Sequence, residues 1–423
     1  MRAGWRERTT DDVVRRHRPD YMILLYTGIL MLIGLVIIYA IGPQRANVLN
    51  NAIGSNFSDT YFFIKQTTSL LLALVAFAIM ASLPYKLVVK HGMKVLVIGL
   101  AACALLFIAS LANLGIAEQV NGASRWFNLG IFGSLQPAEI LKFGLLLYLA
   151  IFLGMRVKEG NVNDLKKSLL PVAVVSGVSL LFIVVIQKDL GTGIALTAIV
   201  LTMLFMAGLS KKVGLTVLGI VLVVGVAFIA SAPHRIERIT TYLQGDNSSV
   251  DDPNGYHIQH AKIAIGSGGL TGVGIGNSVQ ATGYLPEAIN DSVFAILGET
   301  FGFIGLVALL ALFVAILLRL LKVMDHLVDI RLKLLVAGVF GWFGAHVILN
   351  IAAMLGIFPL TGITLPLLSF GGTSMIFITA ALGLVFQLSR YTIHSSRIKE
   401  TTNENSGSGR RIGRTRYASR SGS

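Results

Sequence analysis

The sequence predicts an all-α, polytopic integral membrane protein with about ten transmembrane helices. Of its 423 residues, 54% are hydrophobic and 13% are charged, which is about half of the charged share of a soluble domain. Long apolar runs recur along the chain, and about 20 apolar residues are needed to cross a bilayer as a helix. Backbone groups in lipid must bond internally and no alternating barrel pattern is present, so these runs are predicted to be helices.

Ten spans are predicted within a transmembrane domain of residues 21–390. The apolar run that starts at Tyr21 is too long for a signal peptide, so we interpret it as the first span. The fifth and sixth spans are separated only by the polar residues 187–189. The predicted spans are 21–41, 62–83, 94–116, 136–154, 168–187, 190–208, 213–232, 293–318, 334–356 and 366–388.

The charge distribution predicts the orientation of the chain. The net charge is +14, and most of the 35 Lys and Arg residues lie in two tails and in alternate short loops. The tails are residues 1–20 and residues 391–423, and the second is rich in Ser, Gly and Arg and is predicted to be disordered. Short basic loops stay in the cytoplasm, so both tails are predicted to be cytoplasmic. The charge is therefore a topology signal, or a contact to anionic membrane lipids, rather than a nucleic-acid surface.

A large extracytoplasmic loop is predicted between the seventh and eighth helices, at residues 233–292. It contains Arg235 and Arg238, a polar stretch at 246–255, a short amphipathic helix at 257–265 and a glycine-rich run at 266–276. The glycine run lacks the GK[ST] ending of a phosphate loop, so we expect a tight turn or a re-entrant segment and no nucleotide or organic cofactor. A loop of this size is where chemistry on an extracytoplasmic substrate is expected.

Ionisable residues inside apolar runs are candidates for function, because a charge at bilayer depth is costly. Glu139 and Lys142 are three residues apart and share a helical face, which predicts an ion pair of structural or functional importance. Arg125 and Trp126 precede this span and are either an interface anchor or part of a site. Asp189 is expected either to cap the next helix or to act in a site.

Carboxylates and histidines at the end of the large loop are further candidates. Glu287, Asp291 and Glu299 would share a helical face if the eighth helix began that early, and a half-desolvated carboxylate can serve as a general base. His257 and His260 lack a third ligand at a recognisable spacing, and Cys103 is the only cysteine, so a zinc site is not favoured. The identity of any metal stays unknown from these residues.

Six segments, read in order, resemble one family. They are NGASRW (121–126), QPAEILK (136–142), QKDLG (187–191), AIGSGGLTG (264–272), LPEAINDSVF (285–294), and PLTG (359–362) followed by LPLLSFGG (365–372). Together they resemble the motifs of the SEDS family, whose members include FtsW, RodA and SpoVE. The resemblance extends over about residues 20–390.

The resemblance implies a peptidoglycan glycosyltransferase of the bacterial cytoplasmic membrane. Such an enzyme polymerises lipid II into glycan strands on the outer face and releases undecaprenyl diphosphate. The family's essential carboxylate falls on Asp291, which implies a catalytic base. The residues at other motif positions, implied to bind substrate, are Arg125, Trp126, Glu139, Lys142, Asp189 and Ser369.

The resemblance also implies partners. The expected partners are lipid II, the nascent strand, a class B penicillin-binding protein that supplies the transpeptidase, and other membrane proteins of the division or elongation machinery. A divalent cation, Mg or Mn, is compatible with pyrophosphate chemistry. Basic extensions at both ends favour a division-type, FtsW-like member, and an elongation-type, RodA-like member is the alternative.

The sequence departs from the motifs at several positions. Lys188 stands in place of proline, Ala138 of serine, His257 of glutamine, Asn290 of threonine, Thr300 of a second glutamate, and Phe370 of tyrosine. None of these changes removes the proposed base or the Glu139–Lys142 pair, but they bear on the fine tuning of the site.

Two other functions are compatible with charges inside a helical bundle. A lipid II flippase would need polar groups along a path through both leaflets, whereas the candidates here gather towards the outer face. A scaffold that docks a partner without activity is the third interpretation. The distribution of the candidates favours the enzyme.

Overall fold

A computed structural model describes residues 18–120, 123–128, 130, 133–230, 236–237, 239–241 and 253–392. The two tails lie almost entirely outside these ranges, as do Asn121, Gly122, Arg235, Arg238 and residues 246–252. Within them, nine helices are long and apolar enough to cross a membrane, and α7 is a shorter apolar helix. These ten segments correspond one by one to the predicted spans, which confirms the predicted fold class.

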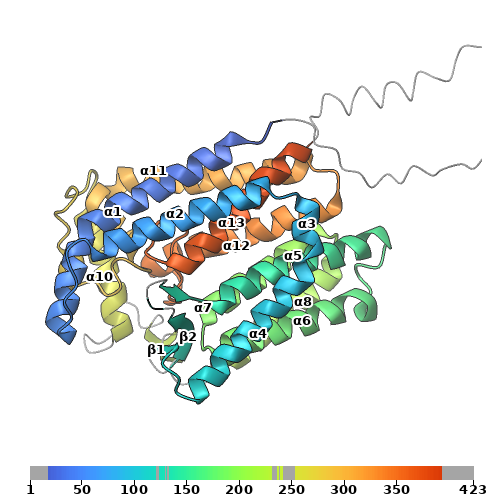
Figure 1. The fold of residues 1–423 in the computed structure, drawn as a ribbon, viewed down its shortest axis with the longest axis horizontal. Coiled ribbons are helices and arrows are strands. Elements are labelled where there is room, and N and C mark those ends of the chain that lie inside the picture. The colour runs from blue at the N-terminus through green and yellow to red at the C-terminus, as the bar shows by residue number, and fades with distance from the viewer. Residues whose placement is uncertain are drawn as a thin grey trace, which may run out of the picture.

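The elements follow one another as a bundle of long, mostly antiparallel helices (Figure 1). The first half comprises α1 (Tyr21–Ile53), α2 (Tyr61–Ser82), α3 (Tyr85–Lys90), α4 (Gly92–Leu111), α5 (Pro137–Lys158), α6 (Leu170–Leu180) with flanking π-helical turns η2 (Leu165–Leu169) and η3 (Leu181–Ile186), and α7 (Leu190–Met206). The second half comprises α8 (Lys211–Ala230), α10 (Pro253–Ser267), the 3₁₀ turn η5 (Gln280–Thr282), α11 (Val293–His326), α12 (Ile330–Met354), α13 (Gly372–Leu388) and η6 (Ser389–Tyr391).

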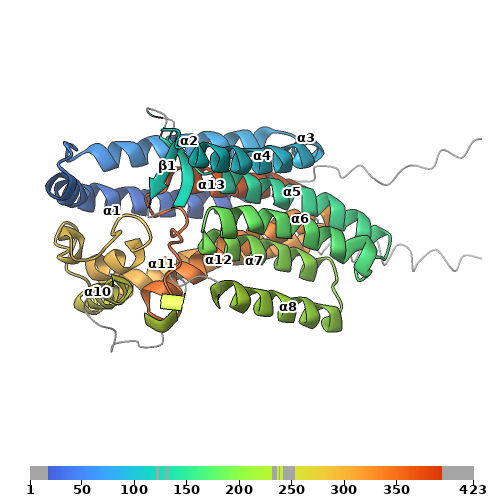
Figure 2. The same cartoon turned by 90° about the horizontal axis from the view of Figure 1, so that it is seen from below.

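Burial divides the bundle into an inner and an outer set of helices. Helices α5, α12 and α13 are the most buried, whereas α8 buries none of its residues and lies apart from α7 in Figure 2. Large apolar side chains such as Leu72, Ile98 and Val223 are exposed on the outer helices. In a soluble protein this surface would aggregate, but in a bilayer it is the surface that contacts lipid.

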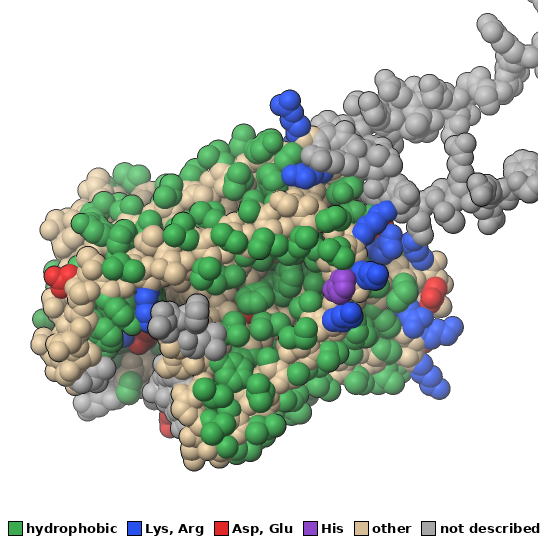
Figure 3. Space-filling model, viewed as in Figure 1, with side chains coloured by type: hydrophobic (Ala, Val, Ile, Leu, Met, Phe, Trp, Pro, Cys, Tyr) green, Lys and Arg blue, Asp and Glu red, His purple; other side chains and the backbone are tan. Residues whose placement is uncertain are grey.

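Lys and Arg side chains gather at one end of the molecule, as Figure 3 shows for the visible face. Figure 1, in the same view, shows that α1 begins and α13 ends at this end, where the Asp20 backbone N–H donates to Ser389 Oγ at 2.8 Å. Asp329, the N-cap of α12, belongs to the same set of loops. Burial acts to raise the pKa of Asp329, but hydrogen bonds from Arg331 and its positive charge outweigh this and lower the pKa below its ordinary value.

The structure differs from the prediction in three details. Within the confirmed all-α class, β1 (Ala117–Val120), β2 (Ala123–Asn128) and β3 (Ser134–Leu135) form a small antiparallel sheet between α4 and α5 that was not predicted. Helix α1 continues past residue 41 to Ile53, with Pro43 inside it. The last span begins at Gly372 rather than at 366, because the preceding residues form turns whose backbone bonds elsewhere, as Phe370 N–H does to Ile289 O at 2.8 Å.

The glycine-rich run forms tight turns that pack on a break in α11. At Gly302 the backbone is non-helical (φ 65°), so the helical hydrogen bonds there are interrupted. The run supplies the missing partners: the N–H of Val273 donates to Glu299 O at 2.9 Å, and the N–H of Phe303 donates to Gly269 O at 2.8 Å. Irregular backbone is tolerated in a membrane protein only where it is satisfied in this way.

Helices α4 and α5 touch at glycine positions. A Cβ on Gly144 would lie 2.5 Å from the backbone nitrogen of Leu96, and one on Gly99 would lie 2.6 Å from the Cα of Leu141. Small residues at a crossing allow helix backbones to approach closely, which is a main source of helix association in lipid. The sheet and the start of α5 are therefore positioned against α4 by contacts that leave no room for a methyl group.

We expect Gly144→Ala to destabilise the protein by about 1–3 kcal/mol, because the added methyl group overpacks a backbone contact. The measurement is the thermal melting temperature of the purified protein in detergent. Gly219→Ala on α8 is the matched control, because no atom lies within 4 Å of a Cβ there. Equal melting temperatures for the two variants would contradict the close α4–α5 packing.

Candidate functional site

The centre of the site is a buried ion pair at the start of α5. Lys142 Nζ donates to Glu139 Oε1 at 2.9 Å, and both side chains are almost fully buried. Their three-residue spacing on a helix brings them together, as the sequence predicts. The second carboxylate oxygen, Glu139 Oε2, is buried without a hydrogen-bond partner. The negative charge of the Glu139 carboxylate is therefore compensated mainly by Lys142.

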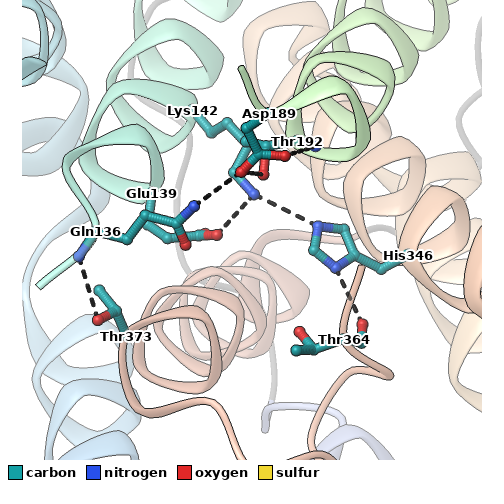
Figure 4. A network of polar contacts seen from close by, with 8 residues as sticks. All are labelled: Gln136, Glu139, Lys142, Asp189, Thr192, His346, Thr364 and Thr373. Atoms are coloured by element: carbon teal, nitrogen blue, oxygen red, sulfur yellow. Dashed lines mark hydrogen bonds and ion pairs between the residues drawn. The ribbon is translucent and has the colours of Figure 1, made fainter. Parts of the chain in front are cut away.

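Helix α12 supplies two more contacts to Lys142. Its Nζ lies 3.4 Å from His346 Nε2 and 4.8 Å from the centre of the Trp342 ring. On its other side, His346 Nδ1 lies 3.4 Å from the carbonyl oxygen of Thr364 (Figure 4). The ammonium therefore contacts a carboxylate, an imidazole and an aromatic face, each of which stabilises a buried positive charge.

Asp189 is held next to this pair by a second group of hydrogen bonds (Figure 4). It caps α7, because its Oδ1 accepts from the Thr192 N–H at 2.9 Å, and its Oδ2 accepts from Thr192 Oγ1 at 2.9 Å. The same Oδ2 accepts from Gln136 Nε2 at 3.2 Å. The expected helix cap is present, and Gln136 also ties it to the residue that precedes α5.

Arg125 and Trp126 lie on β2, the middle strand of the small sheet. The Arg125 guanidinium donates to the carbonyl of Gln187 at 3.2 Å and to that of Lys188 at 2.8 Å. Lys188 has a φ of 52°, a left-handed conformation that a proline, whose φ is near −65°, does not adopt. Lysine in place of the motif's proline is therefore compatible with this turn, and the turn holds Arg125 beside Asp189.

Asp291 lies in the turn directly before α11 and is largely buried. Asn350 Nδ2 donates to the Asp291 carbonyl at 2.7 Å and to the Ile363 carbonyl at 2.7 Å. Ser369 is in the following segment, where its Oγ accepts from the Leu365 N–H at 2.8 Å. Asp291 and Ser369 thus belong to one group of turns, which α12 joins to the Lys142 centre.

The three carboxylates of the large loop do not share a helical face, because α11 begins only at Val293. Glu299 points back from α11 and accepts from Ser278 Oγ at 2.5 Å and from the Val279 N–H at 3.0 Å. Glu287 pairs with Arg45 of α1 at 3.3 Å and accepts from Asn290 Nδ2. Glu287 and Glu299 therefore brace the loop on either side of Asp291.

The histidines of α10 bond to neighbouring side chains. His257 Nε2 lies 2.6 Å from Ser292 Oγ, and His260 Nδ1 lies 2.8 Å from Gln280 Oε1. Within the described ranges, no group of three or more His, Cys, Asp or Glu side chains stands together in a way that could hold a metal ion. A divalent cation bound here would therefore need oxygens of the substrate's pyrophosphate, or water, among its ligands.

Sequence reasoning missed the contribution of α12. Trp342, His346 and Asn350 are spaced by four residues and so lie on one face of the helix. The available signal was a histidine and an asparagine inside an apolar span, where polar residues are expected to have a role. Their partners are 204 and 59 residues away in the chain, and no sequence pattern indicates such pairings.

The fold and the site together define a polytopic helical membrane protein with a buried, charge-bearing centre beside a large folded loop. A family model described as "Cell cycle protein" and named for FtsW, RodA and SpoVE matches residues 20–394. The chain therefore belongs to the FtsW/RodA/SpoVE family, which confirms the resemblance of its motifs.

Individual relatives match over most of their length. Stage V sporulation protein E of Bacillus subtilis is 33% identical over 384 residues, which cover 89% of this chain and 99% of the relative. A protein of Nitrosomonas europaea described as probable peptidoglycan glycosyltransferase FtsW is 32% identical over 377 residues, covering 88% and 93%. One solved structure that is similar describes the structural coordination of polymerization and crosslinking by a peptidoglycan synthase complex. The matching chain of that complex is 26% identical with a TM-score of 0.68, and the match covers 89% of this chain and 99% of that chain.

Removal of one partner of the buried pair should destabilise the protein. For Lys142→Met or Glu139→Gln alone we expect a loss of about 3–5 kcal/mol, because an uncompensated charge or polar group stays buried. The double variant should melt at a higher temperature than either single variant. Glu159→Gln, which breaks the exposed Arg156–Glu159 pair, is the control and should change the melting temperature little. Additive losses in the double variant would show that the two residues are not coupled.

Proposed function

We propose that the chain is a peptidoglycan glycosyltransferase that polymerises lipid II into glycan strands and releases undecaprenyl diphosphate. The membership of the family and the relatives described as FtsW support this activity and favour the division type. The single observation that carries the proposal is the buried Glu139–Lys142 centre, tied through α12 to the turn that bears Asp291. This arrangement provides a cation, Lys142, that can stabilise an anionic leaving group, and a carboxylate, Asp291, that can accept a proton.

Asp291 is the general base in this proposal. Its carboxylate takes the proton of the acceptor sugar's 4-hydroxyl as that oxygen attacks the anomeric carbon of the donor glycan. The bond from that carbon to the pyrophosphate breaks, and the electron pair leaves with undecaprenyl diphosphate. The Asn350 hydrogen bond to the Asp291 carbonyl and the Glu287 and Glu299 contacts hold the surrounding loop, so that the carboxylate stays in reach of the acceptor.

Lys142 and Arg125 stabilise the leaving group. A pyrophosphate ester gains negative charge as the bond breaks, and preorganised cations in a water-poor site stabilise that charge strongly. Glu139 orients Lys142, and the turn before Asp189 orients Arg125. Trp126, beside Arg125, and Ser369, in the turns next to Asp291, complete the proposed substrate-binding set. A divalent cation would add Lewis-acid stabilisation of the pyrophosphate when bound.

The proposed location is the bacterial cytoplasmic membrane, with both termini in the cytoplasm. The large loop at residues 233–292, which contains Asp291 and is called the Asp291 loop below, then lies on the outer face. The Lys and Arg side chains that gather at one end of the bundle support this orientation, because basic loops stay in the cytoplasm. The partners proposed are the lipid II substrate, the nascent strand and a class B penicillin-binding protein. The similarity to a chain of a peptidoglycan synthase complex supports such a partner.

Asp291→Asn should reduce glycan polymerisation by about 10²–10⁴-fold, because the amide cannot accept the proton. The measurement is polymer formed from lipid II in liposomes by the purified protein, with and without its transpeptidase partner. Asp59→Asn is the matched control, because it removes one exposed carboxylate from the loop between α1 and α2. It should keep the native rate.

The same liposomes distinguish the enzyme from a flippase. If the native chain makes no polymer with its partner present, yet moves lipid II between leaflets, the glycosyltransferase proposal fails. If Asp291→Asn folds and polymerises at the native rate, the activity stands but the assignment of the base is wrong.

Single-cysteine labelling should reveal the orientation. In a Cys103→Ala background, Asp59→Cys should react with a membrane-impermeant maleimide on intact spheroplasts, whereas Lys212→Cys should react only after the membrane is opened. Both positions are exposed in the structure. The reverse pattern would place the Asp291 loop in the cytoplasm and overturn the proposed topology.

A further inference from the structure

One face of α12 links the proposed cation to the proposed base. His346 contacts Lys142, and Asn350, one turn further along, contacts the Asp291 backbone. Four residues of an α-helix advance about 6 Å along its axis. His346 is 3% exposed and Asn350 is 1% exposed, so bulk water does not replace either contact.

Both side chains also bond to the same irregular segment. His346 Nδ1 faces the Thr364 carbonyl at 3.4 Å, and Asn350 Nδ2 donates to the adjacent Ile363 carbonyl at 2.7 Å. Each residue therefore has one contact to this shared segment and one contact to a different half of the site. From Thr364 the irregular chain continues through Ser369 to Gly372, where α13 begins.

The chemistry of the partners determines the tautomer of His346. An ammonium carries only donors, so Nε2 of the imidazole must accept from Lys142. A carbonyl oxygen can only accept, so Nδ1 must carry the proton. His346 is then a neutral imidazole with its proton on Nδ1, and it connects the Lys142 ammonium to the Thr364 carbonyl.

We propose that His346 and Asn350 are positioning residues, which hold the Lys142 ammonium and the Asp291 turn at a fixed separation through one face of α12. The consequence of this positioning for catalysis rests on the proposed glycosyl transfer. Neither side chain takes part in the bond changes. Because Lys142 acts on charge that develops at the leaving group, a loss of its position lowers kcat more than it changes KM.

Substitutions at His346 separate its two contacts. The glutamine amide can reach the position of Nε2, so His346→Gln keeps an acceptor for Lys142. The shorter asparagine reaches only the position of Nδ1, so His346→Asn keeps the contact to Thr364 and loses Lys142. We expect His346→Gln to retain most of the polymerisation rate and His346→Asn to lose about tenfold or more in kcat, a magnitude typical of residues that orient a functional group.

Asn350→Asp is the corresponding variant at the other end of the face. It has nearly the same size but replaces the donor to two carbonyls by an acceptor, so we expect kcat to fall with little change in KM. Each variant is first required to elute as a single species and to melt within a few degrees of the native protein. Equal kcat for His346→Gln and His346→Asn would overturn the proposal.

A spectroscopic measurement tests the contact between His346 and Lys142 independently of activity. In protein labelled with ¹⁵N-histidine, the His346 signal is assigned by its loss in His346→Gln, since the chain has eight histidines. We expect an unprotonated Nε2 that shifts in Lys142→Met. A protonated Nε2, or no shift in Lys142→Met, would refute the contact. A native chain without polymerase activity would instead refute the proposed function, whatever the spectrum shows.

Discussion

The buried Glu139–Lys142 pair is the constraint on which the rest of this structure depends. Two charges taken out of water lose several kcal/mol of solvation each, and their mutual attraction recovers this only in good geometry. Here the ammonium has a carboxylate at 2.9 Å, an imidazole and an indole face, supplied by α5 and α12. The close contact of α4 with α5 and the central place of α12 keep these groups together.

The other elements satisfy polar backbone where the helices are broken. The break of α11 at Gly302 and the turns before α13 would be prohibitive if they faced lipid. The glycine run bonds to the first. In the second, the Ile363 carbonyl accepts from Asn350 and the Phe370 N–H donates to the Ile289 carbonyl. Ser369 lies in the second of these segments, and Asp291 lies in the turn before α11, to which that segment bonds, so the irregular backbone and the proposed chemistry occur in the same part of the molecule. Rigid helices around them keep that part in place.

Much of the site could be predicted because its residues are close in sequence or stand out in an apolar background. The Glu139–Lys142 pair follows from a three-residue spacing, and the Asp189 cap follows from its place before an apolar run. The shared face of Glu287, Asp291 and Glu299 was wrong because turns, not a helix, precede Val293. The small sheet was missed because its strands are only two to six residues long.

The sequence by itself determined the class of protein, the number of apolar spans and the motifs, because these depend on composition, run length and local spacing. The tertiary structure decided which motifs meet. Arg125 bonds to residues 187–188, His346 to Lys142 and Asn350 to Asp291, and each pair is separated by tens to hundreds of residues. Such contacts depend on how the helices pack, and packing is determined by many weak contacts along the whole bundle rather than by any local pattern.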